Sequence, residues 1–245
     1  MVDGATASAW PYRPAATSAE LPGAGDLVAF DAEFVSLGKE ETEVREDGTR
    51  GVVNPANFAL ARVSCVAGAA GERLIVDDWV RAAEPVADYL TAYSGIAPVD
   101  LDPARSRRRL VRLPVAVAKL VRLRERGCVF VGHGLAKDFR TANVFVPPGQ
   151  VRDTVHLYAS PDDPRKPALR FLAKAVLGID VQQGSHDSAE DAVAALRLER
   201  LHAACPDRAK WLALVRALFD VGRATGWDVG KVGPDVSVRL HALVE

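Results

Sequence analysis

The sequence has few cysteines, no surplus of charge of either sign and no long apolar run. Its 3 cysteines stand far apart among apolar neighbours, at Cys65, Cys128 and Cys205, which indicates buried thiols and argues against a disulfide framework or a zinc knuckle. The formal net charge is −1, so any affinity for a polyanion has to come from a local site. The longest apolar runs, such as 113-LPVAVA-118, are far shorter than the roughly 20 residues of a membrane-spanning helix.

The first residues also lack the basic start and apolar stretch of a secretory signal, so we expect an intracellular, cytoplasmic protein. With 49% hydrophobic and 26% charged residues, the composition is that of a globular protein. We expect a linker or disordered tail at 1–25, one folded domain at 26–204, a helical extension packed on the core at 205–228 and a flexible tail at 229–245.

Hydrophobic patterning predicts three strands followed by alternating helices and strands. The strands are expected at 27–37, 57–68 and 73–80, and the first two form a hairpin around a polar loop at 38–51. Further expected elements are helices near 86–93 and 117–124, a strand at 128–134, a helix at 136–145, a strand at 150–158, and helices at 168–178, 187–204 and 207–227. This order predicts an α/β protein with a mixed sheet and helices on both faces, as in ribonuclease H-like folds.

Two acidic residues interrupt the first apolar strand, 27-LVAFDAEFVSL-37. Because side chains alternate along a strand, Asp31 and Glu33 point to the same face, about 6.5 Å apart along the chain. Two such carboxylates repel each other unless a cation lies between them, and a hard divalent ion is the usual solution. The alternative for this motif alone is the solvated face of an edge strand.

Two further motifs contribute polar residues from later in the chain. In 132-GHGLAKDFR-140 a buried strand runs through glycines into a helix that carries Asp138, at the rim where open α/β sheets bind ligands. In 186-HDSAEDA-192, Asp187 is expected to cap a helix with Glu190 three residues on, which places Asp191 in the first turn and His186 on the loop before it. Taken singly, such residues are more often solvated surface residues.

The order and spacing of these three motifs match the DnaQ-like exonucleases, which combine four acidic residues with a histidine. The chain resembles in particular the catalytic exonuclease domain of the Pan deadenylase family, over roughly 26–227. The strings that carry this resemblance are 31-DAEFVSL-37, 41-ETE-43, 47-DGT-49, 88-DYLTAYSGI-96, 100-DLDP-103, 131-VGHGLAKDFR-140, 145-FVPP-148, 153-DTVHLY-158, 169-LRFLA-173 and 186-HDSAEDA-192. Members of that family also carry a β-propeller and an inactive ubiquitin-hydrolase-like domain, so the chain is either an excised catalytic domain or a short natural version.

The resemblance implies hydrolysis of poly(A) from the 3′ end, releasing AMP, with two Mg²⁺ ions for which Mn²⁺ substitutes. The implied metal ligands are Asp31, Glu33, Asp138 and Asp191, whose summed charge would exclude phosphate without cations. Asp31 is expected to bridge the ions, with Asp138 nearer the leaving group. His186 is expected to be the general base, because an imidazole with a pKa near 6.5 accepts a proton at neutral pH.

The expected substrate-binding residues are Phe34, His133 and Leu135. Phe34 and Leu135 flank the acidic motifs and are placed to stack on the terminal bases, although Phe34 alternates with Glu33 and is equally compatible with the core. The basic stretch Arg105–Arg112 either follows the phosphates or, as we favour, is a solvated loop.

The implied partners are single-stranded poly(A) RNA, the pseudokinase-like partner subunit of the Pan deadenylase and, through it, poly(A)-binding protein, with association with P-bodies. No membrane is implied. Two alternatives stay open: a related exonuclease that trims other RNA or single-stranded DNA 3′ ends, and a non-catalytic RNA-binding module, which the retention of all five motif residues disfavours.

Overall fold

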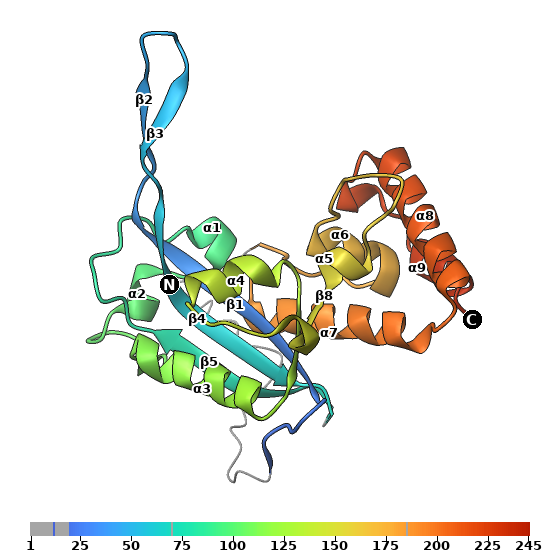
Figure 1. The fold of residues 1–245 in the computed structure, drawn as a ribbon, viewed down its shortest axis with the longest axis horizontal. Helices are drawn as coiled ribbons and strands as arrows, with labels where there is room; N and C mark the ends of the chain where they lie inside the picture. The colour runs from blue at the N-terminus through green and yellow to red at the C-terminus, as the bar shows by residue number, and fades with distance from the viewer. Residues whose placement is uncertain (1–11, 13–19, 70, 185) are drawn as a thin grey trace, which may run out of the picture.

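A six-stranded sheet forms the centre of the molecule in the computed structural model, which describes Tyr12 and residues 20–69, 71–184 and 186–245 (Figure 1). The strand order is β6-β5-β4-β1-β7-β8. β1 pairs antiparallel with β4, and β4 with β5, whereas the β1–β7, β7–β8 and β5–β6 pairs are parallel. The strands are β1 Leu27–Gly38, β4 Asn57–Ala67, β5 Arg73–Val80, β6 Leu110–Val111, β7 Val129–Gly132 and β8 Val151–Asp153.

Helices cover both faces of this sheet, which confirms the expected fold class. α3 (Leu113–Glu125) and α4 (Leu135–Thr141) pack on one face, where Phe30, Phe130 and Phe139 lie in ring contact. The longer α7 (Ser188–Ala204) covers the other face and contacts β1, β4 and β7. The shorter helices are α1 Thr91–Ser94, α2 Pro98–Leu101, α5 Thr154–Leu157, α6 Leu169–Leu172, the 3-10 turns Pro148–Gln150 and Val229–Lys231, and the π-helical turn Ala173–Leu177.

The alternation of side chains along β1 decides which face carries the acidic residues. Phe30 and Ala32 pack into the core under α3 and α4, whereas Ala29 packs into the core under α7. Asp31 and Glu33 have the same parity as Ala29 and therefore face the α7 side. No helix within the described ranges is long and apolar enough to cross a membrane.

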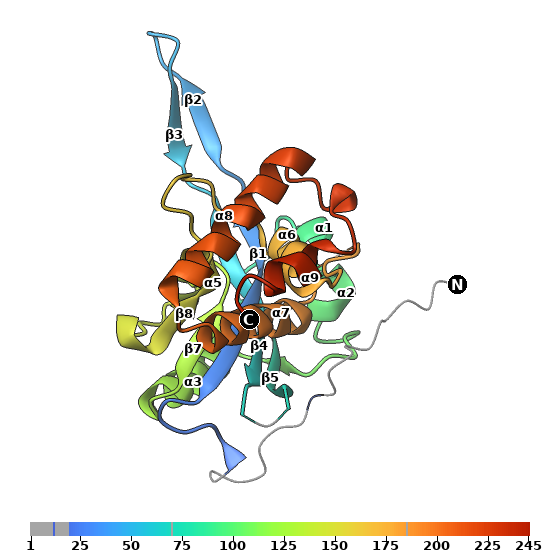
Figure 2. The same cartoon turned by 90° about the vertical axis from the view of Figure 1, so that its right-hand side faces the viewer.

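Several expected elements have different bounds in the structure. The segment 38–51 is not only a polar loop, because β2 (Glu41–Val44) and β3 (Arg50–Asn54) pair into an arm that projects beyond the body in Figures 1 and 2. The helix expected at 86–93 is reduced to α1, since Asp88 pairs with Ser36 on β1 and Leu90 adopts a left-handed φ of 52°.

Two elements after β7 are also shorter than expected. The helix expected at 136–145 ends at Thr141, because Asn143 has a left-handed φ of 52° and Val144 turns into the core. The strand expected at 150–158 stops at Asp153, whose carboxylate accepts from the amide of Val155 and so starts α5.

The carboxyl-terminal part packs on the α7 side of the molecule. α8 (Arg208–Thr225) buries Trp211, Leu218 and Phe219 in the same core cluster as α7. The segment 229–245, expected to be a flexible tail, contains α9 (Val236–His241), which buries Val236 and Leu240 in that cluster. The linker or tail expected at 1–25 lies mostly outside the described residues.

Candidate active site

The first two acidic residues lie at the centre of the sheet, on its central strand β1. Asp31 is paired with Ser64 and Glu33 with Arg62 across the β1–β4 ladder, and a register shift follows between Glu33 and Phe34. Glu33 is 6% exposed. A carboxylate this buried costs free energy unless a cation or a proton accompanies it.

Asp138 comes to the site from α4, whose first amides are held by the carboxylate of Asp153. The carboxylate of Asp153 accepts from the amides of Gly134 and Leu135, both at 2.9 Å. Gly134, the residue that caps the start of the helix, has a left-handed φ of 82°. A Cβ on Gly132 would collide with Leu135 and with the carbonyl of Phe30. The turn therefore requires glycine, and the short helix carries Asp138, which is 8% exposed, into the site.

The start of α7 supplies Asp191 and the loop that carries His186. Asp187 caps the helix by accepting from the amide of Ala189 at 2.9 Å, as its position predicts. Glu190 does not complete a capping box with Asp187, because its carboxylate accepts from the amide of Gln182 at 2.9 Å. The side-chain amide of Gln182 in turn donates to Asp191 Oδ2 at 2.8 Å.

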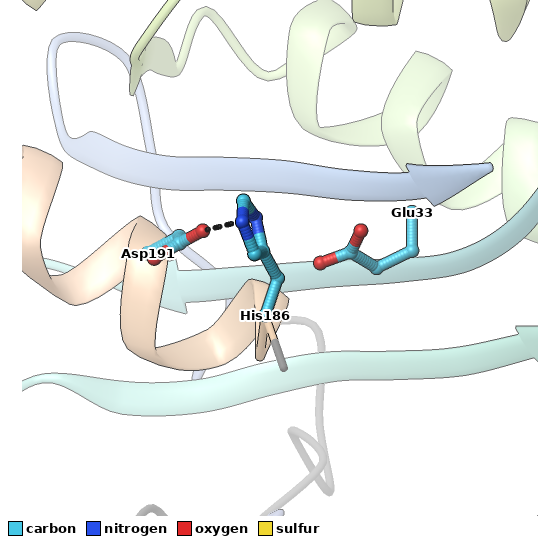
Figure 3. A group of neighbouring side chains, drawn as sticks. All are labelled: Glu33, His186 and Asp191. Carbon is cyan, nitrogen blue, oxygen red and sulfur yellow. Dashed lines mark ion pairs between the residues drawn. The ribbon is translucent and has the colours of Figure 1, made fainter. Parts of the chain in front are cut away.

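Three of these side chains meet in one cluster, drawn in Figure 3. One ligand atom each from Glu33, His186 and Asp191 lies within 4.8 Å of the others. The imidazole ring of His186 lies between the two carboxylates, and its Nδ1 is 3.5 Å from Asp191 Oδ2. β1 and the start of α7, which are far apart in the chain, therefore form one site.

Burial raises the pKa values of all four acidic residues, and the charges of neighbouring carboxylates add to this effect. Burial raises the pKa of Glu33 to about 9, with a further contribution from the charge of Asp191. Burial likewise raises the pKa values of Asp138 and Asp191 to about 7. The pKa of Asp31 is raised by burial and by the charges of Asp191, Glu33 and Asp138, so the structure brings the four acidic residues together.

The donor set fits a hard divalent cation. Glu33 Oε1 and Asp191 Oδ1 are buried and have no hydrogen-bond partner among the described residues, and such orphaned oxygens are costly unless something binds them. Carboxylate oxygens are the ligands preferred by Mg²⁺ and suit Mn²⁺ as well. A cation bound among the four carboxylates would favour their charged forms and so oppose the burial that raises their pKa values.

The expected substrate-binding residues differ in their surroundings. Phe34 is half-buried, and the ammonium of Lys137 lies 6.0 Å from its ring centroid, so one part of the ring packs on the core and another is accessible. His133 is half-buried beside Thr154 Oγ1 at 2.9 Å, and burial lowers its pKa. Leu135 is 1% exposed and packs in the core. Leu135 therefore has no free face for a base in this structure.

Two residues of the site, Arg62 and Gln182, belong to none of the sequence motifs. Arg62 is a buried cation on β4 opposite Glu33, and its only sequence signal is an arginine within the apolar strand 57–67. Gln182, which binds Asp191, lies in a polar loop and has no such signal.

Within the basic stretch, Arg108 pairs with Asp100 at 3.3 Å and stacks over the ring of Trp79. The other arginines of this stretch are exposed: Arg105, Arg107, Arg109 and Arg112.

The fold and the acidic site define a nuclease of the exonuclease class. The family model described as Exonuclease matches residues 28–198, and the chain belongs to this family. The matched region runs from β1 into α7 and includes every acidic residue of the site.

The relatives within this family are catalytic subunits of a deadenylation complex. The chain is 53% identical over 185 residues to the PAN2-PAN3 deadenylation complex catalytic subunit PAN2 of Cryptococcus neoformans, covering 74% of this chain and 16% of the relative. It is 43% identical over 216 residues to PAN2 of Saccharomyces cerevisiae, covering 87% of this chain and 19% of that protein. These matches confirm the resemblance to the Pan deadenylase, and the chain spans about a fifth or less of these relatives.

Solved structures agree with this relationship. The Saccharomyces cerevisiae Pan2 pseudoubiquitin hydrolase–RNA exonuclease module in complex with AAUUAA RNA superposes with a TM-score of 0.79 at 41% identity, over 89% of this chain and 35% of that one. The Neurospora crassa Pan2 catalytic unit, a protease and nuclease domain, superposes with a TM-score of 0.73 at 35% identity, over 89% of this chain and 33% of that one. The chain therefore corresponds to the exonuclease part of these modules.

Proposed function

We propose that the chain is a divalent-metal-dependent 3′ exoribonuclease that shortens poly(A) tails and releases AMP. The observation that carries this proposal is the cluster of the buried Glu33 and Asp191 with the half-buried His186, whose acidic members act with Asp138 on Asp31. The chain is an exonuclease whose relatives are named as deadenylation subunits. The proposal goes beyond the family, because it specifies substrate, direction and product.

In this proposal Asp31, Glu33, Asp138 and Asp191 hold two Mg²⁺ ions, for which Mn²⁺ substitutes. Bound there, the ions supply positive charge that offsets the carboxylates, lowers the pKa of a water and stabilises the leaving oxygen. Asp31 is assigned as the shared ligand, because the charges of the other three acidic residues all act on it. The buried oxygens of Glu33 and Asp191 that lack a partner in the described part of the chain support their assignment as ligands.

His186 is assigned as the general base. Its Nδ1 is directed at Asp191 Oδ2, 3.5 Å away, which leaves Nε2 to accept the proton of the attacking water. Burial and the charge of Arg170 lower the pKa of His186, so the ring is neutral and able to accept a proton at pH 7. The half-exposed ring of Phe34 is proposed to contact the terminal base.

We further propose that the chain acts as part of an assembly. The relatives are named as subunits of a PAN2-PAN3 complex, and on that basis a PAN3-type, pseudokinase-like subunit is the proposed partner. Poly(A)-binding protein is proposed as a contact through that subunit.

The test is incubation of the purified chain with end-labelled RNA that ends in an A tract, with and without Mg²⁺. We expect stepwise shortening and release of AMP with Mg²⁺, and an intact substrate in excess EDTA or with the Asp31→Ala variant. The same RNA with a 3′ phosphate should resist digestion, because an added dianion would crowd the four carboxylates. Cleavage of circular RNA would contradict an exonuclease, and equal digestion of poly(U) or single-stranded DNA would favour a general 3′ trimming enzyme.

A further inference from the structure

Arg62 is a buried cation beside the acidic site. It is 6% exposed, stands opposite Glu33 in the β1–β4 ladder, and its guanidinium lies 4.9 Å from the ring centroid of Trp79. Its Nε donates to Asp77 Oδ1 at 2.7 Å and its Nη1 to Asp187 Oδ1 at 3.1 Å. The planar fork therefore connects β5 to the residue that caps α7.

Asp187 has two partners, and both concern the position of α7. The same Oδ1 that binds Arg62 accepts from the amide of Ala189 and so starts the helix. Two residues further along β4 from Arg62, Ser64 Oγ lies 2.7 Å from Ser188 Oγ, and both serines are fully buried. Strand β4 thus holds the first residues of α7 at two successive positions on one face.

The loop that precedes α7 is also held at its other end. Glu190 accepts from the amide of Gln182, and Gln182 donates to Asp191. His186 directly precedes Asp187, so its backbone position follows from the contact between Arg62 and Asp187. The cluster of Glu33, His186 and Asp191 forms only if the start of α7 stays in this register with β1.

We propose that Arg62 is a positioning residue that aligns His186 and Asp191 with Glu33 by holding Asp187. The expected effect on cleavage rests on the proposed function. The alignment itself is a matter of where the metal ligands lie and does not depend on the reaction. A lysine cannot reproduce it fully, because a single ammonium lacks the planar fork that reaches both carboxylates. The charge of Arg62 also lowers the pKa values of Asp31 and Glu33, against the effect of burial.

The test compares Arg62→Met and Arg62→Lys with a matched control, Lys119→Met. Lys119 pairs at 2.6 Å with Asp78, a fully buried carboxylate whose strand partner Val63 lies in the core under α3. The control therefore removes one cation from a partly buried ion pair away from the acidic site. Thermal unfolding, Mn²⁺ titration by calorimetry and the cleavage rate at saturating metal are measured for each. Asp187→Asn, which keeps the capping oxygen but removes the charge, serves as a second variant should Arg62→Met fold poorly.

We expect Arg62→Met to weaken Mn²⁺ binding about tenfold and to slow cleavage by about tenfold to a hundredfold, as outer-shell substitutions and small misplacements do. Arg62→Lys should recover part of both losses, and Lys119→Met should lower the unfolding temperature without changing either. In a His186→Ala background Arg62→Met should slow cleavage less than in the wild type, because the two changes act on one unit.

Several outcomes would overturn the inference. If Arg62→Met behaves like Lys119→Met, with lower stability but unchanged Mn²⁺ affinity and rate, Arg62 is structural only. If Arg62→Met and His186→Ala slow cleavage by factors that simply multiply in the double variant, Arg62 does not act through His186. Calorimetry needs no substrate, so a wild-type protein that binds Mn²⁺ but cleaves no RNA would refute the proposed function and still test the alignment.

Discussion

Glu33→Gln should stabilise the metal-free protein and abolish its activity. Burial and the charge of Asp191 raise the pKa of Glu33 from 4.5 to about 9. Between these two values the folded state binds a proton that the unfolded state does not. The stabilising effect of that proton is fully present below pH 4.5 and is lost as the pH rises toward 9, so the free energy of unfolding of the metal-free wild type falls with pH in this window.

The size of the effect follows from the same shift. A pH of 8 lies about 3.5 units above the pKa of the carboxyl in the unfolded state. Binding a proton at this pH therefore costs the folded wild type about 5 kcal/mol, at about 1.4 kcal/mol per unit. The buried glutamine amide has its own desolvation cost of about 1 to 3 kcal/mol. We therefore expect a net gain of about 2 to 4 kcal/mol for Glu33→Gln at this pH, decreasing as the pH is lowered.

Urea unfolding at a series of pH values, in EDTA and then in Mg²⁺, measures this effect. In Mg²⁺ the order should reverse, since the wild type gains stability from the bound metal and the variant has lost a ligand. A variant that is less stable than the wild type in EDTA at pH 8, or a difference that does not change with pH, would refute the argument.

The remaining predictions concern the base, the shared ligand and the turn before α4. His186→Ala should leave Mg²⁺ affinity nearly unchanged in calorimetry and slow cleavage by about 10² to 10⁴; loss of Mg²⁺ binding would instead make His186 a ligand. The rising limb of the wild-type pH–rate profile should lie below pH 6.5, because the pKa of His186 is lowered from 6.5. Asp31→Asn should abolish turnover in Mg²⁺ at any metal concentration, as a gel assay with labelled RNA would show. Gly132→Ala should lower the free energy of unfolding by about 1 to 3 kcal/mol, because its Cβ would meet Leu135 and the carbonyl of Phe30, and an unchanged urea midpoint would contradict this.

The sequence predicts what depends on periodicity and capping. Alternation along β1 places Asp31 and Glu33 on one face, and the Asp187 cap places Asp191 in the first turn of α7, as the structure shows. Both features are local, because a strand has a side-chain period of 2 and a cap fixes the first turn of a helix. Together they account for most of the candidate site.

Contacts set by strand register are not predictable in this way. That Arg62 lies beside Glu33 depends on the β1–β4 pairing and its irregularity after Glu33, and a shift by one residue would reverse the face of every side chain. Leu135 is buried in the core instead of being free to stack on a base, because its side chain packs closely against Gly132. Sequence spacing alone does not predict this contact. The short helices near Thr91 and after Asp153 depend on tertiary contacts that override the local pattern.

The β2–β3 arm is an insertion between β1 and β4, which pair with each other as an antiparallel hairpin. Gly38 and Asn57 are register partners at the end of the β1–β4 ladder, so the chain leaves the body and returns to it at one point. The arm exposes Val44, Val52 and Val53 and is joined to no other sheet. A two-stranded hairpin of this kind has little stability of its own, so its amides should exchange with solvent far faster than those of β1 and β4. Opening of the arm at this end of the ladder therefore need not displace Asp31 and Glu33, which are paired with Ser64 and Arg62 inside it.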